Sequence, residues 1–520
     1  MKSLHDRVGM TVPGRLHRGF LAGTAPIAAL ALGLILAIGL AATVVRITAP
    51  TAQVPPVDAS APPRPSCAGT RVPAGDSVQA AIDRGPPRAT LCLGRGVHRL
   101  HRALVPKAGQ RLIGEPGAVL NGAAPVSSFR RAGTGWVADG VVPTTPAVNG
   151  VCMPGYHGCR YSEAVFLDGR PLWRVTALSE LGAGEFYQDY PAGRLHIADD
   201  PTGHQVEVAR AKAAIDGPAA GVTVRGLVVE KFANDAQRGA ITGGSDWMIE
   251  GNEVRFNHGV GIQTPAARRV KVLGNHVHHN GQLGIAGWRT TEAIYAGNEL
   301  AFNNTAGFYN ADWEAGGGKW TESTRLTVRD NHVHDNRAVG LWFDLGNNDV
   351  TVEGNRMERN DSDGIRYEIS YRAAIRDNTV TGNGFKEPTA GVNGAGIMVS
   401  SARAVEVSGN LVDTNFNGIT LRQDDRGGGP LGAYVLQDTW VHDNRVVMRR
   451  GTTGLSSSDA SSYSSRRNRF LDNRYTVVGS DATSFAWRGA ELTWAQWRQH
   501  GHDLGGTYSH EGVGRAIASR

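Results

Sequence analysis

The sequence repeats a pair of asparagines five residues apart, and this repeat limits the possible folds more than any other feature. The pairs are Asn252 and Asn257, Asn275 and Asn280, Asn298 and Asn303, Asn331 and Asn336, Asn355 and Asn360, Asn378 and Asn383, and Asn410 and Asn415. Their first members are 23, 23, 33, 24, 23 and 32 residues apart. A fixed period of this size indicates a solenoid in which each repeat forms one coil, with insertions of about ten residues in two coils.

Each repeat alternates apolar and polar residues, as in "HVHHN" and "EVRFN", which is the periodicity of a β-strand. Gly and Asn stand where tight turns need left-handed backbone. We therefore predict an all-β chain folded as a right-handed parallel β-helix of about ten coils. In this fold Asn275, Asn298, Asn331, Asn355 and Asn378 form one axial hydrogen-bonded column. A leucine-rich repeat shares the period but needs a dense Leu pattern, which is missing.

The sequence outside the Asn repeat predicts caps and an insertion. Residues 67–121 contain a short amphipathic helix and form the N-terminal cap and first coils, because the end of a solenoid exposes strand edges that must be covered. Residues 122–215, with "VFLDGRPLWRV" and "GEFYQDYPAGRLHIADD", lack the repeat and read as a β-rich insertion. The β-helix repeats then occupy 216–446. Residues 447–520 form the final coil and a C-terminal cap, in which "AELTWAQWRQHG" places its Trp residues on one helical face.

The N-terminal 66 residues are expected to direct the chain out of the cytoplasm. Residues 25–47 include 21 consecutive uncharged residues and follow a basic cytoplasmic segment, 1–24, so they read as a transmembrane signal anchor. A cleaved signal peptide is the alternative. Residues 48–66 form a Pro/Ala-rich linker. The rest of the chain is then a cell-surface domain, or a secreted one if the segment is cleaved.

Charge excludes one class of partner. The whole chain carries a formal +6, and residues 1–50 account for +4 of it, so the exported part carries only about +2. This is too weak a positive charge for nucleic-acid binding. We expect a monomer.

Four cysteines lie early in the exported part, and four cysteines allow three disulfide connectivities. We favour Cys67 with Cys92 and Cys152 with Cys159, because near neighbours close short loops. A zinc site is the alternative, but the spacing lacks a CxxC and the compartment is oxidising.

The register of the repeat singles out two acids. Nine residues after the first Asn of a coil stands a Gly (Gly261, Gly284, Gly307, Gly340, Gly364), followed by an apolar residue that points inward (Ile262, Ile285, Phe308, Leu341, Ile365). Strand alternation then turns the residues at +11 and +13 outward. Those at +11 are Gln263, Ala286, Tyr309, Trp342 and Arg366, and those at +13 are Trp288, Ala311, Asp344 and Glu368. Asp344 and Glu368 thus stack on adjacent coils, whose strand backbones are about 4.8 Å apart.

Two stacked carboxylates with no cation between them repel, so that one pKa rises while the other stays low. A retaining glycosidase uses such a pair, because one group donates a proton while the other attacks the anomeric carbon. We therefore predict that Asp344 and Glu368 are catalytic.

The ten-residue insertion before Asn331 adds "FYNADWEAGGGKW" and brings Asp312, Glu314 and Lys319 to the same face. For Lys319 two roles stay open, an ion pair that orients Glu314 or Asp344, and direct substrate contact. Flat aromatic surfaces for stacking a sugar ring are expected from Trp288, Tyr309, Trp313, Trp320 and Trp342. We also place Asn347, Arg366 and Tyr367 at the substrate-binding surface.

The histidines at 276, 278, 279, 332 and 334 follow ladder asparagines. A metal site from "HVHHN" is one interpretation, and polar surface on an outer strand is the one that we favour, with His334 the best candidate for a role in substrate binding. We expect no metal and no cofactor. Asp424 and Asp425 could border the cleft, but we expect them to hold Arg422 and Arg426.

These features resemble the right-handed parallel β-helix, or pectin-lyase-like, superfamily over residues 67 to about 475. "GLWFD", followed 24 residues after its Asp by "YEIS", resembles the paired motif of β-helical retaining glycoside hydrolases of the β-xylosidase kind. "VFLDGRPL" and "GEFYQD" look like the β-rich insertion of such enzymes, and "EAGGGK" is similar to a motif of uncharacterised bacterial β-helix proteins. The resemblance implies that Asp344 is the nucleophile and Glu368 the acid/base.

Two alternatives to a glycoside hydrolase remain. A polysaccharide lyase or epimerase would use Lys319 as its base and an Arg such as Arg366 to hold a uronate. A non-catalytic surface module would bind glycans along one face of the solenoid, but it leaves the repulsive pair without a purpose.

Overall fold

The structure is a computed structural model that describes residues 67–143, 150–386, 393–479 and 483–511. These residues belong to one compact unit. The expected segments 1–24, 25–47 and 48–66 lie outside the described residues. Within the described ranges, no helix is long and apolar enough to cross a membrane.

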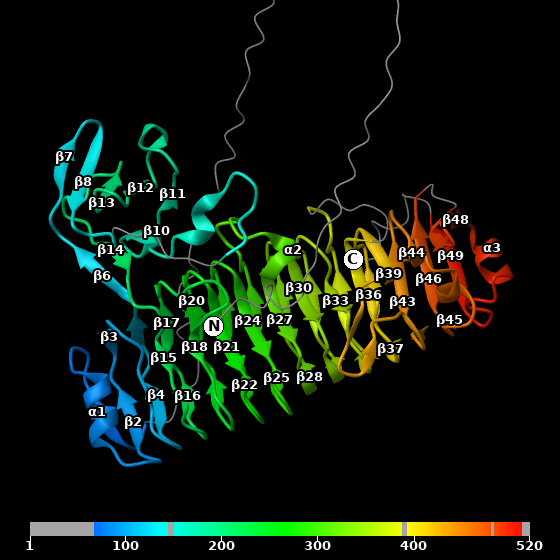
Figure 1. Cartoon of the computed structure of the whole chain (residues 1–520), viewed down its shortest axis with the longest axis horizontal. Coiled ribbons are helices and arrows are strands. Elements are labelled where there is room, and N and C mark those ends of the chain that lie inside the picture. The colour runs from blue at the N-terminus through cyan, green and yellow to red at the C-terminus, as the bar shows by residue number, and fades with distance from the viewer. Residues whose placement is uncertain (1–66, 144–149, 387–392, 480–482, 512–520) are drawn as a thin grey trace, which may run out of the picture. The chain divides into compact units, whose positions relative to one another are not determined.

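The chain folds as a right-handed parallel β-helix, in which each coil contributes one strand to each of three long sheets (Figure 1). Sheet 1 has 13 strands in the order β1 (Thr70–Val72), β2 (Thr90–Leu93), β4 (Arg111–Gly114), β16 (Thr223–Arg225), β19 (Met248–Glu250), β22 (Lys271–Leu273), β25 (Ile294–Ala296), β28 (Thr324–Arg329), β31 (Asn348–Glu353), β34 (Ala373–Arg376), β37 (Val405–Ser408), β42 (Trp440–His442) and β45 (Arg469–Leu471).

Sheet 2 also has 13 strands. They are β3 (Gly96–Arg99), β5 (Ala118–Asn121), β17 (Val228–Glu230), β20 (Glu253–Arg255), β23 (His276–His278), β26 (Glu299–Ala301), β29 (His332–His334), β32 (Arg356–Glu358), β35 (Thr379–Thr381), β38 (Leu411–Asp413), β43 (Arg445–Met448), β46 (Arg474–Val478) and β49 (Thr507–Glu511). The solenoid is therefore longer than the expected ten coils, because strands of both cap regions extend its sheets.

Sheet 3 carries the predicted catalytic pair. Its 12 strands are β15 (Ile215–Asp216), β18 (Gly239–Thr242), β21 (Val260–Pro265), β24 (Leu283–Trp288), β27 (Gly316–Thr321), β30 (Val339–Asp344), β33 (Ile365–Glu368), β36 (Ala395–Ser400), β39 (Asn417–Gln423), β44 (Thr453–Ser457), β47 (Phe485–Trp487) and β48 (Ala490–Leu492). All its pairings are parallel except that of β47 with β48. Inward-facing residues such as Ile285, Leu341 and Ile365 are almost fully buried in one continuous core.

The two asparagines of each repeat form two internal ladders, and the predicted axial column is confirmed. Asn275, Asn298, Asn331, Asn355 and Asn378 each donate from the backbone N and from Nδ2 to Oδ1 of the next ladder residue, at 2.9–3.0 Å. This ladder continues through Asn410, Asn444 and Asn473 and ends on Asp503. The second ladder runs from Asn257 to Asn415.

The residue before each ladder Asn, rather than the Asn itself, has left-handed backbone. Gly274 has φ +57° and Gly297 has φ +64°, while Asp330 takes φ +55° at the same point of its coil. Gly adopts this region without strain, and Asp adopts it more readily than most residues. This explains why Gly or Asp precedes the first Asn of so many repeats.

Both ends of the described solenoid carry a short helix. Helix α1 (Val78–Arg84) is N-capped by Ser77 and buries Val78, Ala81 and Ile82. Helix α3 (Trp494–Gln499) begins with a capping box formed by Thr493 and Gln496, and it buries Trp497 completely. The tryptophans of α3 thus serve as cap core, as the sequence indicates.

Residues 123–209 form two small sheets inserted between β5 of sheet 2 and β15 of sheet 3. One has four strands, β10 (Arg170–Pro171), β9 (Val165–Leu167), β14 (Val206–Ala209) and β6 (Ala123–Val126), and the other has five, β11 (Trp173–Arg174), β12 (Glu185–Asp189), β13 (Arg194–Ile197), β8 (Gly135–Asp139) and β7 (Arg130–Ala132). A buried ion pair of Lys231 Nζ with Glu207 Oε2, 2.6 Å long, ties the insertion to the β-helix.

The remaining short elements are α2 (Ala311–Glu314), the 3-10 helices η2 (His157–Arg160), η3 (Leu178–Glu180) and η4 (Ala460–Tyr463), and the hairpin of β40 (Gly428–Gly429) with β41 (Gly432–Ala433). The cysteines pair as Cys67–Cys92 and Cys152–Cys159, which is the connectivity favoured by the sequence.

Candidate functional site

Three neighbouring strands of sheet 3 bring the charged residues of the site together. The register pairs Lys319 on β27 with Trp342 on β30, and Trp342 with Arg366 on β33. Two residues further along, Thr321 lies beside Asp344. Glu368 stands two residues after Arg366 and is the last residue of β33. The side chains alternate, so these residues share the outer face while Phe343 and Tyr367 between them face the core.

Asp344 has two oxygens in different surroundings. Its Oδ2 lies 2.9 Å from Lys319 Nζ, whereas its buried Oδ1 has no hydrogen-bond partner in the described structure. The side chain as a whole is 17% exposed. Oδ1 therefore has unused acceptor capacity, but it is buried, so an incoming group can reach it only if neighbouring side chains move.

Lys319 lies between two carboxylates. Its Nζ is 2.9 Å from Asp344 and 3.2 Å from Glu314 Oε1, it donates to the carbonyl of Trp313, and it stands 3.5 Å above the centre of the Trp342 ring. Burial acts to lower the pKa of Lys319, but the charges of Asp344 and Glu314 outweigh it and raise that pKa overall. The amine is therefore held as an ammonium ion. This geometry confirms that Glu314 and Lys319 reach Asp344.

Glu368 is deeply buried and held from two sides. Trp342 Nε1 donates to its Oε1 at 2.7 Å, and Arg426 Nη1 lies 3.3 Å from its Oε2. Burial raises the pKa of Glu368, the charge of Asp344 raises it further, and the nearby Arg366 and Arg426 only partly oppose this. The protonated form of Glu368 is thus favoured at a higher pH than for an ordinary glutamate.

Arg366 is buried and donates hydrogen bonds to two neighbouring side chains. Its Nε donates to Asp363 Oδ2 at 2.6 Å and its Nη2 donates to Ser362 Oγ at 3.1 Å, while Asp312 lies 3.7 Å from Nη1. Asp363 is fully buried and its other oxygen accepts from the backbone of Ala395. Arg366 therefore orders the turn before β33, and burial with these contacts fixes the position of its guanidinium.

The structure corrects the register predicted for the inserted coil. Tyr309 and Ala311 were expected at +11 and +13, but Lys319 and Thr321 hold these places, because the inserted residues precede the strand. Tyr309 is fully buried and forms a bridge with Cys152 beside the Cys152–Cys159 disulfide. It packs away from solvent and presents no stacking surface.

Several other residues expected to bind substrate have structural roles instead. Trp320 is 1% exposed and stacks on Phe343 in the core, and Tyr367 is fully buried with its hydroxyl on the carbonyl of Tyr371. Asn347 is also fully buried, where its amide donates to the carbonyls of Trp320 and Asp344.

Of the expected stacking surfaces, Trp342 is only 3% exposed, because Lys319 and Arg366 cover its ring. Trp288 and Trp313 remain partly exposed and can stack on a sugar. His334 lies on sheet 2, away from this group, and contacts Glu299 and Asp335.

The sequence analysis expects no cation between the two acids, but the structure places cations beside both of them. Asp344 and Glu314 share Lys319, and Glu368 contacts Arg426. Arg426 reaches the site from the loop after β39, 58 residues beyond Glu368, so no spacing in the repeat indicates it. Asp424 and Asp425 were expected to hold Arg422 and Arg426. The pair of Arg422 with Asp424 does form, whereas Arg426 pairs with Glu368 instead.

Two surface cavities of the described structure lie elsewhere. One of about 630 Å³ lies in the β-rich insertion between Phe129, Trp136 and His204, and one of about 290 Å³ lies near Arg474 and Tyr508 in the last coils. Neither contains charged groups arranged like those around Asp344. Reactive groups are concentrated on sheet 3, and we therefore locate the candidate active site there.

Comparisons with known proteins agree with the fold. Residues 240–412 match a family described as "Right handed beta helix region". The solved structure described as "The complex structure of XylC with xylose" superposes with a TM-score of 0.61 at 14% identity, covering 77% of this chain and 80% of that chain. The chain thus has the pectin-lyase-like fold.

Two further solved structures are more distant. The A-module of the Azotobacter vinelandii mannuronan C-5 epimerase AlgE6 has a TM-score of 0.45 at 14% identity, covering 84% of this chain and 94% of that chain. A polygalacturonase from Erwinia carotovora ssp. carotovora has a TM-score of 0.33 at 10% identity, covering 86% and 96%. A search of curated protein sequences found no match.

Proposed function

We propose that this right-handed parallel β-helix is a carbohydrate-active enzyme and, more narrowly, a retaining glycoside hydrolase that acts on an extracellular poly- or oligosaccharide. One observation carries the proposal. Asp344 keeps an oxygen without a partner beside Glu368, a buried carboxyl whose pKa is raised. A nucleophilic carboxylate next to a protonated carboxylic acid is the pair that retaining hydrolysis requires.

In this mechanism Asp344 Oδ1 attacks the anomeric carbon while the bond from that carbon to the leaving oxygen breaks. Glu368 gives its proton to the leaving oxygen, and a covalent glycosyl ester on Asp344 results. Glu368, now ionised, then takes a proton from a water molecule. The water oxygen attacks the anomeric carbon, the ester bond breaks, and Asp344 returns to its starting state.

Lys319 supports the proposed nucleophile without reacting. Its ion pair to Oδ2 fixes the Asp344 carboxylate and leaves Oδ1 as the attacking oxygen. Glu314 holds Lys319 from the other side, so the ammonium group is positioned by two acids. This supports the first of the two roles considered for Lys319, an ion pair that orients the acids.

The lyase alternative has less support. Lys319 would have to abstract a proton as a free amine, but its pKa is raised overall and the ammonium form is favoured. Arg366 would have to hold a uronate, but its guanidinium already donates to Asp363 and Ser362. A glycan-binding module without catalysis would not need the raised pKa of Glu368.

Access to the site is narrow. The side chains of Asp344 and Glu368 are 17% and 10% exposed, while Arg426, which lies against Glu368, is 33% exposed. A sugar that reaches both acids must therefore contact Arg426 or displace it. We place Arg426 at the substrate boundary for this reason.

A panel of aryl glycosides and natural glycans tests the proposal, with β-xylosides first because the fold neighbour XylC was solved with xylose. Asp344→Ala should abolish turnover, and azide should restore part of it with formation of a glycosyl azide of inverted configuration. Glu368→Ala should slow substrates with poor leaving groups far more than activated aryl glycosides. Asp349→Ala, which removes an acid paired with Arg372 on sheet 1, is the matched control and should retain activity.

If a substrate is found and either Asp344→Ala or Glu368→Ala hydrolyses it at near wild-type rates, the assigned pair is wrong. An unsaturated product absorbing in the ultraviolet would favour the lyase instead. Binding of glycans without turnover across the whole panel would favour the non-catalytic module.

The cellular setting is part of the same proposal. We propose export through residues 25–47, a membrane-anchored or secreted domain, and a monomeric state. Protease accessibility of the domain on intact cells, followed by size measurement of the released domain, checks all three. Protection from protease would contradict the proposed extracellular position.

A further inference from the structure

The outer face of sheet 2 carries a group of histidines that the proposed hydrolysis does not use. The register places His276, Glu299 and His332 side by side on β23, β26 and β29, and places His278, Ala301 and His334 side by side two residues further along the same strands. Ala301 has the smallest side chain of this grid and is completely buried.

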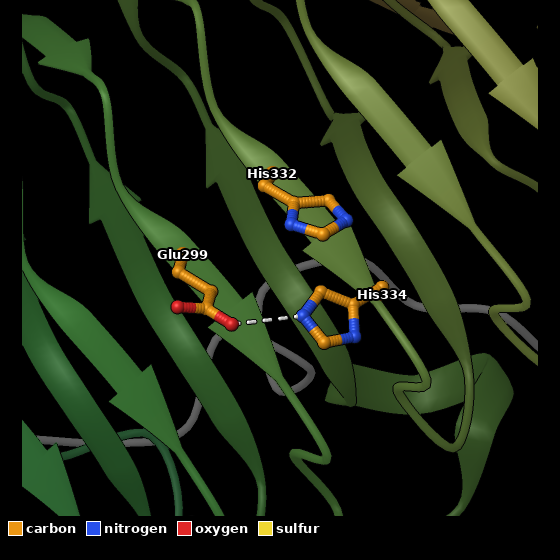
Figure 2. Close-up of side chains that lie close together, drawn as sticks. All are labelled: Glu299, His332 and His334. Atoms are coloured by element: carbon orange, nitrogen blue, oxygen red, sulfur yellow. Dashed lines mark hydrogen bonds and ion pairs between the residues drawn. The ribbon is translucent and has the colours of Figure 1, made fainter. Parts of the chain in front are cut away.

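We propose that Glu299, His332 and His334 bind a divalent transition-metal ion of the zinc type. Each offers one ligand atom, and these three atoms lie within 4.8 Å of one another. Figure 2 shows the two imidazoles and the carboxylate lying close together, with Glu299 Oε1 3.1 Å from His334 Nε2. Tetrahedral zinc with bonds of about 2.0–2.1 Å separates its ligand atoms by roughly 3.3 Å, so small side-chain rotations close the site.

Carboxylates on the far side of each ring orient the two imidazoles. Asp335 Oδ2 lies 2.7 Å from His334 Nδ1, and Glu358 Oε2 lies 3.0 Å from His332 Nε2. A carboxylate accepts a hydrogen bond, so these two ring nitrogens donate to Asp335 and Glu358. The other nitrogen of each ring is the one that would bind the ion, and for His334 Nε2 the ion would replace the proton now shared with Glu299. Metal-binding histidines commonly have such a partner on the second nitrogen.

Arginines fix these two carboxylates in turn. Arg359 donates to both oxygens of Asp335, at 2.9 and 2.7 Å, and Arg356 donates to Glu358 at 2.7 Å. The acids next to the histidines are thus occupied by guanidinium groups and orient the imidazoles, while Glu299 receives no hydrogen bond from Arg or Lys among the described contacts. This arrangement leaves Glu299 as the carboxylate available to the ion.

The ligand set selects the class of ion. Two imidazoles and one carboxylate suit Zn²⁺, Co²⁺, Ni²⁺ or Cu²⁺, whereas Ca²⁺ and Mg²⁺ prefer oxygen ligands alone. Glu299 and His332 are 44% and 37% exposed, so the ion can enter from solvent and water can take a further position. The site lies on sheet 2, a different face from the acids of sheet 3.

The chain contains a natural comparison for this site. His442 is also held between two acids, with Nδ1 2.8 Å from Asp443 and Nε2 3.1 Å from Glu406. The sequence around it, "WVHDN", differs from "HVHDN" at 332–336 only in having Trp440 where the other has His332. The two groups have the same types of residue apart from the second imidazole, although Asp443 and Glu406 are more exposed than Asp335 and receive no hydrogen bond from Arg among the described contacts.

Calorimetric titration of the metal-stripped full chain with Zn²⁺ at neutral pH tests the proposal. About one ion per chain should bind, and His334→Gln or His332→Gln should remove this binding. Asp335→Asn should weaken it by about 10- to 100-fold, as loss of an orienting carboxylate does at other metal sites. His442→Gln should leave both stoichiometry and affinity unchanged.

Titration with Co²⁺ gives a second readout, because its visible absorption reports the coordination geometry and should disappear in His332→Gln. Circular dichroism of each variant separates loss of the site from loss of the fold. No bound ion at millimolar Zn²⁺, or binding that survives both His332→Gln and His334→Gln, would overturn the proposal. Neither readout depends on glycan hydrolysis.

Discussion

Trp342 Nε1 donates a 2.7 Å hydrogen bond to Glu368 Oε1 on the next coil, so the residue two positions before the proposed nucleophile holds the proposed acid. A donor of this kind stabilises the ionised carboxylate and opposes the rise in the pKa of Glu368 that burial and Asp344 cause. The indole thus limits how far that pKa rises.

Replacing Trp342 by Phe should raise the pKa of Glu368 further, because the ionised form loses its hydrogen bond while burial persists. Hydrolysis needs protonated Glu368, so the alkaline limb of the pH profile of kcat/KM should move to higher pH. The measurement is a pH–rate profile on an aryl glycoside. Trp288→Phe, whose Nε1 has no hydrogen-bond partner in the described structure, should leave the limb in place.

Arg426→Ala removes a positive charge 3.3 Å from Glu368 and should move the same limb in the same direction. KM should also change if Arg426 contacts the sugar, as its position at the entrance suggests. Arg422→Ala is the matched control, since Arg422 lies near the end of β39, four residues before Arg426, but pairs with Asp424. A limb that moves equally in both variants would show that the loop as a whole, and not the contact to Glu368, sets the pKa.

Lys319→Met should strongly destabilise the fold. The change leaves Asp344 and Glu314 without their shared cation in a mostly buried place, and loss of one partner of a buried ion pair costs about 3–5 kcal/mol. Urea unfolding followed by circular dichroism measures the effect. Lys212→Met breaks an exposed pair with Asp235 and should cost less than about 1 kcal/mol.

Glu368→Gln should stabilise the protein at neutral pH. The folded-state pKa of Glu368 is raised above its usual 4.5, so the stability of the wild type is full below pH 4.5 and falls as the pH rises toward the folded-state pKa. The amide does not ionise and escapes this loss, which amounts to about 1.4 kcal/mol for each pH unit between the two pKa values. The free energies of unfolding of variant and wild type should therefore agree near pH 4 and separate above it.

Glu253→Gln provides the opposite sign. The hydrogen bond with His278 lowers the pKa of Glu253 to about 2, so its contribution to stability is present above its usual pKa of 4.5 and is lost as the pH falls through about 2. This variant should be less stable than the wild type at neutral pH and should converge with it in acid. If the free energy of unfolding changed with pH in the same way for Glu368→Gln and Glu253→Gln, the raised pKa of Glu368 and the lowered pKa of Glu253 would both be contradicted.

Asn331→Ala should destabilise the middle of the solenoid. It removes the Oδ1 that accepts from the backbone N and Nδ2 of Asn298, and it leaves buried donors without partners at about 1–3 kcal/mol each. A large drop in the urea midpoint is expected. Asn348→Ala, whose amide bonds only to Asp349 at the surface among the described contacts, should change stability by less than about 0.5 kcal/mol.

Most of the fold is predictable from the repeat, because every coil must place an Asn side chain at the same point along the axis. The ladder from Asn275 to Asn378 and the adjacency of Asp344 and Glu368 both follow from counting residues. The same counting failed in the coil with the insertion. Gly307 and Phe308 imitate the Gly and apolar residue that begin a strand, whereas the strand itself begins at Gly316.

The sequence did not predict which aromatic side chains are buried or which distant residues contact the site. Trp320 stands one position from Lys319 and therefore faces the core, because successive side chains of β27 alternate between the two faces. With the strand of this coil placed too early in the sequence, Trp320 falls in an apparent loop and is predicted to be a sugar platform. Arg426 reaches Glu368 from a loop outside the repeat. The histidines of sheet 2 come together because β23, β26 and β29 pair side by side. Such contacts arise from the stacking of coils, and local periodicity does not encode them.

The first asparagine ladder also has a direction. Each Asn-to-Asn hydrogen bond is donated toward the C-terminal side, so these bonds run head to tail along the axis as in a polymer, while the second hydrogen of each Nδ2 goes to a backbone carbonyl of the preceding coil. Asp503 has an acceptor but no amide donor to pass on, and it therefore acts as a chain terminator that an anion suits electrostatically. Duplicating a whole coil upstream of Asp503 would lengthen this polymer without interrupting it, whereas a coil added after Asp503 would find no donor to continue from. Growth of such a solenoid by repeat duplication is thus possible inside the array and blocked at its end.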